Sequence, residues 1–246
     1  MTLEIALIIV GILIVIVGLV SGITSIWLVI KYFRFNRKEN SLGLTGMQIA
    51  RKILDDNGLE HIKVKRTGSI LFGNSYSHYF KKVRLRGLIR HETSLTSMGM
   101  GAQQAALAIL DKEGDADMKK RIRLVPLITF GPFAFIPLLL IGGALDYFVF
   151  NGSGVCTLAL GAIGLLLYIY AIVLSVLTLK TEKKAQDLAY EILERDYRIT
   201  DDELSSLKKL FHLYNIQYIN DIILSSLELL YPLLEIAIAV KGTVDD

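Results

Sequence analysis

Residues 5–30 read IALIIVGILIVIVGLVSGITSIWLVI, an unbroken apolar run without an ionisable side chain. About 20 such residues are enough for a helix to cross the hydrocarbon core of a bilayer. Glu4 stands before the run, where a cleavable signal peptide would carry basic residues, and no clear small-residue cleavage site follows. The run therefore predicts that residues 1–30 form a permanent transmembrane helix and that the chain is an integral membrane protein.

The composition of the whole chain agrees with this prediction. Its 246 residues are 52% hydrophobic, and its mean hydropathy is +0.48. Such values are typical of a membrane protein that also has a water-facing part. The single cysteine, Cys156, excludes an internal disulfide framework and a cysteine-based zinc site. Because Cys156 lies in an apolar run, we expect it to pack as a small hydrophobic side chain.

Two later regions, 124–179 and 216–246, are also apolar enough to contain membrane-spanning helices. Residues 124–179 predict two spans, at 124–145 and 155–179, and the three prolines of the first predict a kink. The last region, 216–246, predicts either a fourth span or an interfacial amphipathic helix, followed by a short tail. Four polar or charged side chains leave this choice open: Asn220, Asp221, Glu228 and Glu235. The expected fold is therefore mainly α, with three to four transmembrane helices.

The basic residues predict which side of the membrane each region occupies. Residues 31–123 hold 19 of the 27 lysines and arginines, and residues 180–215 hold seven more. The positive-inside rule places both regions in the cytoplasm of a multi-pass cell-membrane protein. The basic stretch KYFRFNRK at 31–38 directly follows the first span, so it favours contact with anionic lipid over a nucleic-acid arm. No nucleic-acid motif follows it, and we expect no nucleic-acid partner.

The cytoplasmic regions carry signals for both helices and strands. Between Thr45, a predicted N-cap, and Gly58, residues 46–57 predict a helix. The alternating HIKVKR at 61–66 and KKVRLR at 81–86 predict short strands with one exposed face, separated by a turn-rich segment. Further helices are predicted over about 94–113, over 180–196 as a continuation of the third span, and over 200–211 after a Thr200–Glu203 capping box. Residues 31–123 thus form a cytoplasmic α+β region, and residues 180–215 form cytoplasmic helices.

Five stretches stand in an order that is characteristic of one family. They are LGLTGMQIARKILDDNGL (42–59), KKVRL (81–85), DKEG (111–114), TLKTEKKAQDLAYEIL (178–193) and ITDDELSSLKKLF (199–211). Together they resemble the YugP-like bacterial membrane zinc metallopeptidases over nearly all of residues 42–220. The resemblance implies a zincin-like cytoplasmic region. It also implies a catalytic helix with an H-E-x-x-H motif, in which two histidines bind zinc and the glutamate activates water, and a distal glutamate as third ligand.

This chain departs from that pattern where the chemistry resides. By register, the two histidine positions hold Gln103 and Leu107, the general-base position holds Gln104, and the third ligand position holds Glu182. A neutral amide is a weak zinc ligand and leucine offers no donor atom. The resemblance therefore predicts a degenerate member of the family: a pseudopeptidase without catalytic residues, metal or cofactor, which binds, scaffolds or regulates at the membrane.

Neighbouring positions of the family site have changed as well. The family's D-H-Y-D-P segment falls on residues 74–78, which read NSYSH, so both acidic positions are lost. An asparagine near the third ligand is replaced by Lys184. Under this interpretation, the partners are the lipid bilayer and another membrane protein, such as an active peptidase relative.

Two alternatives remain open. A rebuilt metal site that uses His78, His91 and Glu182 would make the chain an active zinc-dependent endopeptidase; however, the His91-Glu92 pair is followed at i+4 by Leu95 and lacks the second histidine. Otherwise we expect His91 in a loop, and Glu182 on a solvated face or paired with a lysine or arginine. Small-molecule transport through the spans is the second alternative, and Asp221 is its main candidate. We expect Gly99 and Gly101 to allow close packing of helices beside the spans, since no phosphate-loop context surrounds them.

Overall fold

The computed structural model describes residues 2–67 and 73–245, except for the side chains at 2, 125–133, 236 and 239–245. The chain is mostly helical and separates into two compact units. The apolar unit comprises Met1–Val20, Lys120–Thr178 and Ile219–Asp246, and the polar unit comprises Ser21–Lys119 and Leu179–Tyr218.

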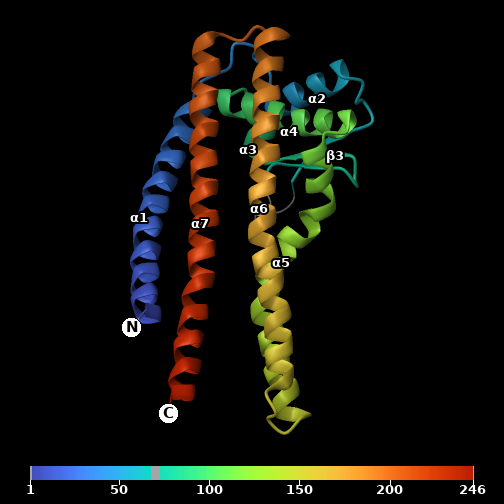
Figure 1. Ribbon diagram of the computed structural model, residues 1–246. Helices are drawn as coiled ribbons and strands as arrows, with labels where there is room; N and C mark the ends of the chain where they lie inside the picture. The colour runs from blue at the N-terminus through green and yellow to red at the C-terminus, as the bar shows by residue number, and fades with distance from the viewer. Residues whose placement is uncertain (1, 68–72, 246) are drawn as a thin grey trace. The chain divides into compact units, whose positions relative to one another are not determined.

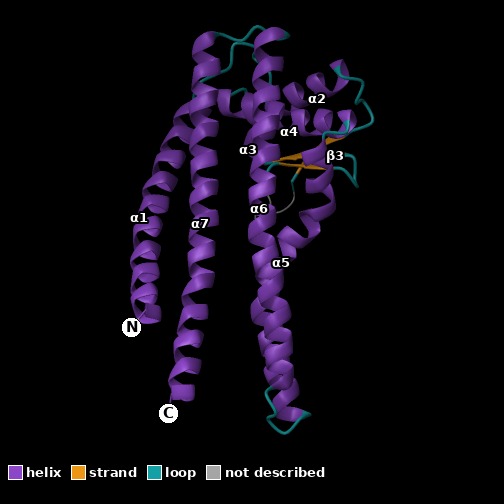
Figure 2. Cartoon of the chain, in the orientation of Figure 1, coloured by secondary structure: helices purple, strands orange, loops and turns teal. Residues whose placement is uncertain are grey.

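Figure 1 shows the order of the elements along the chain, and Figure 2 distinguishes helices from strands. The described elements are α1 (Thr2–Asn36), α2 (Gly46–Asp56), β1 (Lys63–Arg66), β2 (Ser75–Ser77), β3 (Lys82–Leu85), α3 (Gly87–His91), α4 (Leu95–Glu113), α5 (Ala116–Phe148), α6 (Val155–Arg195) and α7 (Asp201–Asp245).

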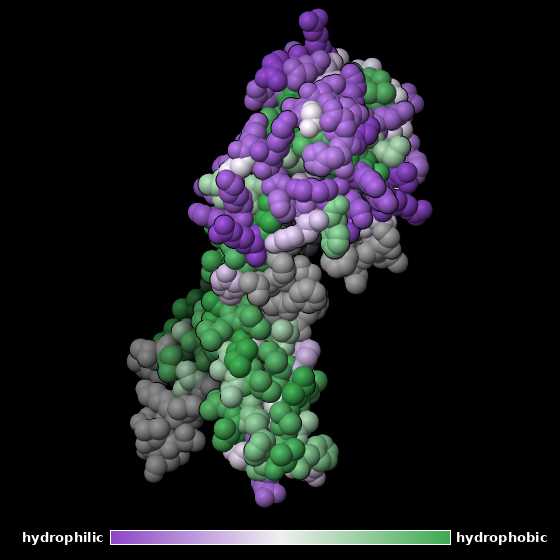
Figure 3. Space-filling view, turned by 90° about the vertical axis from the view of Figure 1, so that its right-hand side faces the viewer, coloured by the Kyte–Doolittle hydropathy of each residue, from purple (hydrophilic) through white to green (hydrophobic). Residues whose placement is uncertain are grey.

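Two helices within the described residues are long and apolar enough to cross a membrane. They run over Leu3–Asn36 and Val155–Arg195, and a shorter apolar helix covers Ala134–Phe148. Isoleucine and valine side chains project outward along α1, as expected where lipid replaces water. In Figure 3 hydrophobic residues gather over the apolar unit and hydrophilic residues over the polar unit. Within the predicted span at 124–145, the side chains of residues 125–133 lie outside the described set, so the predicted proline kink stays a prediction.

Small residues bring α5 and α6 together within the apolar unit. A Cβ atom added to Gly142 would lie 2.7 Å from the Cα atom of Thr157, and one added to Gly164 would lie 3.0 Å from the Cα atom of Phe135. Asp146, which is buried, joins the same two helices at the loop. Its carboxylate accepts hydrogen bonds from the backbone N–H groups of Cys156 and Thr157, at 3.0 and 2.7 Å. These bonds satisfy donors that the first turn of α6 would otherwise leave unpaired.

The last helix differs from the sequence prediction. Separate elements were expected at 200–211 and 216–240, whereas α7 is one continuous helix that includes both regions. The physical reason is that residues 201–231 contain neither glycine nor proline, so nothing breaks the helix before Pro232. Within the described residues, α7 is not among the helices that are long and apolar enough to cross a membrane.

The polar unit contains the small sheet and a compact helical core. The strand order is β1-β3-β2, with β1 parallel and β2 antiparallel to β3. The predicted strands β1 and β3 are confirmed, but β2 was missed because its sequence, SYS, is too short and polar to be recognised. Helices α2 and α4 contact the strands on the side to which Val83 and Leu85 point, and both side chains are fully buried.

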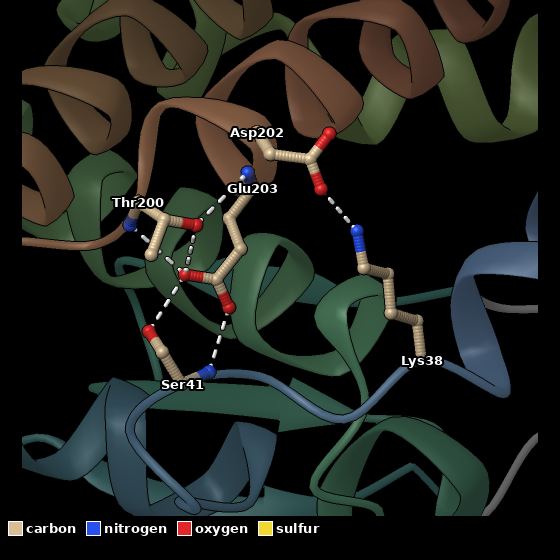
Figure 4. A network of polar contacts seen from close by, with 5 residues as sticks. All are labelled: Lys38, Ser41, Thr200, Asp202 and Glu203. Atoms are coloured by element: carbon tan, nitrogen blue, oxygen red, sulfur yellow. Dashed lines mark hydrogen bonds and ion pairs between the residues drawn. The ribbon is translucent and has the colours of Figure 1, made fainter.

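The helices of the polar unit begin and end where the capping residues predict. Thr45 forms a complete capping box with Gln48 at the start of α2, and Ser94 caps α4. The Thr200–Glu203 capping box is also present (Figure 4), with the backbone N–H of Thr200 3.0 Å from the Glu203 carboxylate. The caps at Thr45 and Thr200 were predicted because they depend on local side-chain chemistry, whereas the Ser94 cap was not predicted.

The close contact between α2 and α4 depends on two glycines. A Cβ atom added to Gly101 would lie 2.4 Å from the carbonyl oxygen of Gly46, and one added to Gly46 would lie 2.2 Å from that of Ile89. Gly101 therefore allows α4 to approach the first turn of α2. The expectation that Gly101 packs beside a membrane span was wrong, because glycine periodicity does not reveal which helix will be the neighbour.

Candidate functional site

Helix α4, to which the resemblance assigns the catalytic motif, is buried within the polar unit. All residues of α4 from Leu95 to Leu110 are buried. Ser94 accepts a hydrogen bond from the backbone N–H of Ser97 at 3.1 Å, and Gly114 ends the helix with a φ of 72°. The alanine-rich middle of α4 allows its neighbours to approach closely, and the only long polar side chains there are two glutamines.

The first of these glutamines contacts the residue in the third ligand position. The Gln103 side-chain Nε2 donates a hydrogen bond to Glu182 Oε2 at 2.8 Å, although 79 positions separate the two residues in the chain. Gln103 is buried, and Glu182 lies on α6 within the polar unit. The fold thus brings together the two positions that the resemblance assigns to a histidine ligand and the distal glutamate. Glu182 itself is half-buried rather than fully solvated.

The other two positions of the motif are also buried. Leu107, one helical turn after Gln103, is completely inaccessible to solvent and belongs to the hydrophobic core. Gln104 is buried too, and its Oε1 atom forms no hydrogen bond with any described residue. An imidazole, an amide and a leucine side chain fill similar volumes, so the helix can retain its packing without retaining its donor atoms.

A second polar connection lies two residues beyond Glu182. Lys184 Nζ forms ion pairs with Asp115 at 2.8 Å and with Asp117 at 2.6 Å, where α4 gives way to α5. Lys180 adds a pair with Asp117 at 3.1 Å. The hydrogen bond from Lys184 holds the pKa of Asp115 and that of Asp117 below their ordinary values. The α6 segment is therefore attached to the α4–α5 junction by charge as well as by packing.

A third cluster lies at the far end of α4, around Asp111. Its Oδ2 atom accepts a hydrogen bond from the Tyr76 hydroxyl at 2.6 Å and lies 2.6 Å from His78 Nδ1 and 3.7 Å from Lys81 Nζ. Burial raises the pKa of Asp111, but the hydrogen bonds and positive charges more than offset that effect and lower it. Burial and the Asp111 carboxylate raise the Tyr76 pKa, so the phenol stays protonated and remains a donor.

The residues of the alternative metal site have different surroundings. His78 faces Asp111, Glu182 faces Gln103, and His91 is the exposed last residue of α3 rather than a loop residue. Glu92 follows as the C-cap of that short helix. Among residues 2–67 and 73–245, no group of three His, Cys, Asp or Glu side chains is arranged to hold a metal ion.

Sequence reasoning did not identify the Lys184–Asp117 and Asp111–His78 contacts. The acidic run DKEGDAD at 111–117 and the basic run KTEKK at 180–184 were visible signals of complementary charge. Neither run indicates its partner, because each could equally be a solvated helix face. Only the packing of α6 beside α4 shows that the two runs meet.

Comparisons with known proteins identify the family of this chain. The sequence profile of the family described as "Putative neutral zinc metallopeptidase" matches residues 9–237. The chain is 26% identical over 197 residues to the "Putative membrane protease YugP" of Bacillus subtilis (strain 168), a match that covers 80% of this chain and 83% of that protein. No solved structure matches significantly. Since the profile covers most of the chain, this protein belongs to the "Putative neutral zinc metallopeptidase" family.

Proposed function

We propose that this chain is a pseudopeptidase: a membrane protein that retains the peptidase scaffold, lacks zinc catalysis, and acts by binding or regulating a partner. The observation that carries the proposal is the hydrogen bond from Gln103 to Glu182. It places an amide donor against the one remaining carboxylate of the family's ligand set.

The donor set present does not fit zinc. Catalytic zinc sites use three protein ligands, which are mostly imidazole nitrogens and carboxylate oxygens, and leave one position for water. Here Glu182 is the only such group of the three, because Gln103 offers a neutral amide and Leu107 offers nothing. Gln104 has no basic carboxylate with which to take a proton from water. Each of these changes alone would impair the chemistry, and together they remove every step of it.

The polar contacts explain how the scaffold remains folded without a metal. A zinc ion bound by α4 and α6 would hold the two helices together. In this chain the Gln103–Glu182 hydrogen bond and the ion pairs of Lys184 with Asp115 and Asp117 connect α6 to α4 and to the α4–α5 junction. The scaffold is thus stabilised by contacts that perform no chemistry, which favours a role in binding.

This role includes an arrangement in the membrane. We infer a multi-pass cell-membrane protein with three or four spans and a cytoplasmic polar unit, because the basic residues concentrate in that unit. The expected partner is another membrane protein, such as an active member of the same family, which a catalytically silent copy would regulate by pairing with it.

Metal content tests the proposal directly. The full chain is purified in detergent and dialysed against a buffer that contains zinc. It should then bind far less than about one zinc ion per chain. It should also fail to cleave a casein substrate. The matched variant Gln103→His/Gln104→Glu/Leu107→His restores the H-E-x-x-H spacing beside Glu182 and should bind about one zinc. About one zinc per wild-type chain, removed by a chelator together with proteolytic activity, would overturn the proposal.

Family membership favours one second candidate, an active zinc endopeptidase with a rebuilt site. It requires His78, His91 and Glu182 to converge on a metal. Replacing His78 and His91 with alanine would then abolish both zinc binding and cleavage, whereas under the pseudopeptidase proposal neither variant changes the metal content.

A further inference from the structure

The outward face of the small sheet gathers positive charge. In the pairing of β1 with β3, Lys63 lies beside Lys82 and Lys65 lies beside Arg84. Side chains alternate between the two faces of a strand, and the intervening Val83 and Leu85 are buried against the helices. Lys63, Lys65, Lys82 and Arg84 therefore share the opposite face, which we call the basic face.

This arrangement has a cost within the folded chain. Like charges directly opposite each other on neighbouring strands destabilise a sheet. The neighbouring strand β2 contributes only Ser75 and Ser77 to the same face, beside Arg84 and Lys82. Among the described residues, no carboxylate forms an ion pair with any of the four cations. A partner that carries closely spaced negative charges would relieve this repulsion.

Exposed aromatic side chains border the basic face. Tyr79 and Phe80, in the turn between β2 and β3, are 68% and 62% exposed. The Phe80 ring lies 5.6 Å from both Lys82 Nζ and Arg84 Cζ, so it is held at the edge of the cations. Aromatic rings next to lysine and arginine are characteristic of protein surfaces that rest at the headgroup level of a bilayer.

We propose that the basic face, together with Tyr79 and Phe80, docks on anionic phospholipid headgroups. The cations would contact lipid phosphates, and the two aromatic rings would enter the interface. Lipid is favoured over other polyanions because two helices of this chain are suited to cross a membrane, so that headgroups are its nearest anionic surface. A second basic stretch, at residues 31–38, directly follows the apolar part of α1 and would face the same headgroups.

The test uses the full chain in lipid nanodiscs. An environment-sensitive fluorophore is attached to Tyr79→Cys in a Cys156→Ala background, in discs of phosphatidylcholine alone or mixed equally with phosphatidylglycerol. We expect a blue shift, and quenching by spin-labelled lipid, only in the anionic discs. Both signals should be lost near 1 M salt, where the screening length falls to about 3 Å.

A charge-matched pair of variants separates this surface from net charge. Lys63→Gln/Lys65→Gln/Lys82→Gln should reduce the ratio of quenched to unquenched label about a hundredfold, at roughly fivefold per cation. Lys183→Gln/Lys208→Gln/Lys209→Gln removes the same charge from exposed positions on α6 and α7 and should leave the ratio unchanged. An equal effect of both variants, or no dependence on phosphatidylglycerol, would overturn the proposal. A response to RNA or polyglutamate in phosphatidylcholine discs, with none to phosphatidylglycerol, would overturn it in favour of a soluble polyanion.

Discussion

The Gln103 amide lies 2.8 Å from the Glu182 carboxylate, so a residue of α4 and a residue of α6, 79 positions apart, form one part-buried polar pair. A hydrogen bond between two partly buried polar groups contributes to stability only while both groups are present, so removing either member should lower the stability of the fold. The pair therefore has a structural role that can be measured independently of any metal or substrate.

Replacing Gln103 with alanine should reveal that role. We expect a loss of roughly 1–3 kcal/mol in the free energy of unfolding, because Glu182 loses the hydrogen bond from Gln103. For a chain of this size, that corresponds to about 2–4 °C in Tm for each kcal/mol. A double-mutant cycle with Glu182→Ala, followed by thermal unfolding in detergent, isolates the pair. A coupling energy of zero would show that the pair contributes nothing to stability.

The ion pairs of Lys184 should be weaker and sensitive to salt. The Lys184→Gln variant loses contacts with Asp115 and Asp117, both of which are partly exposed, so we expect a smaller fall in Tm than for Gln103→Ala. The difference from the wild type should shrink as salt is raised. Lys183→Gln, at the adjacent exposed position, is the matched control and should leave Tm unchanged. A salt-independent effect of Lys184→Gln would mean that packing, not charge, holds α6 in place.

Glu203 should make the stability of the polar unit sensitive to acid. Its buried carboxylate accepts hydrogen bonds from the backbone N–H and hydroxyl groups of both Ser41 and Thr200 (Figure 4). Burial raises the pKa of Glu203, but the bonds from Ser41 and Thr200 outweigh that effect and lower it from its ordinary 4.5. Its contribution is therefore fully present above pH 4.5 and is lost as the pH falls through the lowered pKa.

The Glu203→Gln variant tests this pH dependence. It should be less stable at pH 7 by about 2 kcal/mol, since hydrogen bonds to a charged acceptor become bonds to a neutral one. Between pH 5 and pH 3 the difference in Tm between the variant and the wild type should narrow. Asp201→Asn removes a neighbouring exposed carboxylate and serves as the control. A constant difference in Tm across this pH range would contradict the proposed titration.

The contact between α2 and α4 predicts a steric effect. Gly101→Ala would place a Cβ atom 2.4 Å from the Gly46 carbonyl oxygen, so the backbones must move apart. We expect a loss of about 1–3 kcal/mol or more, which is typical of overpacked cores. Gly22→Ala is the control, because a Cβ atom there meets nothing within 4 Å, and alanine favours the helix by about 0.5–1 kcal/mol. Equal stability of both variants would show that the helices tolerate separation at this point.

Much of the local structure was predictable from residues close together in the chain. The apolar run at 5–30, the cap at Thr45 and the Thr200–Glu203 capping box are short-range signals, and the helices they predict are present. The alternation in HIKVKR and KKVRLR likewise predicted β1 and β3. The three-residue strand β2 was missed because it exists only through its pairing with β3.

The sequence by itself determined that Gln103, Gln104 and Leu107 lie within one turn of one helix, because register along a helix is a property of spacing, and the resemblance assigns them the places of the family's zinc-binding motif. Only the tertiary structure decided what surrounds them. The Gln103–Glu182 hydrogen bond, the Lys184–Asp117 ion pair and the Gly46–Gly101 contact each join segments more than 50 positions apart. Such contacts depend on which helix faces overlap after packing, and neither the hydropathy nor the charge of one segment specifies its neighbour.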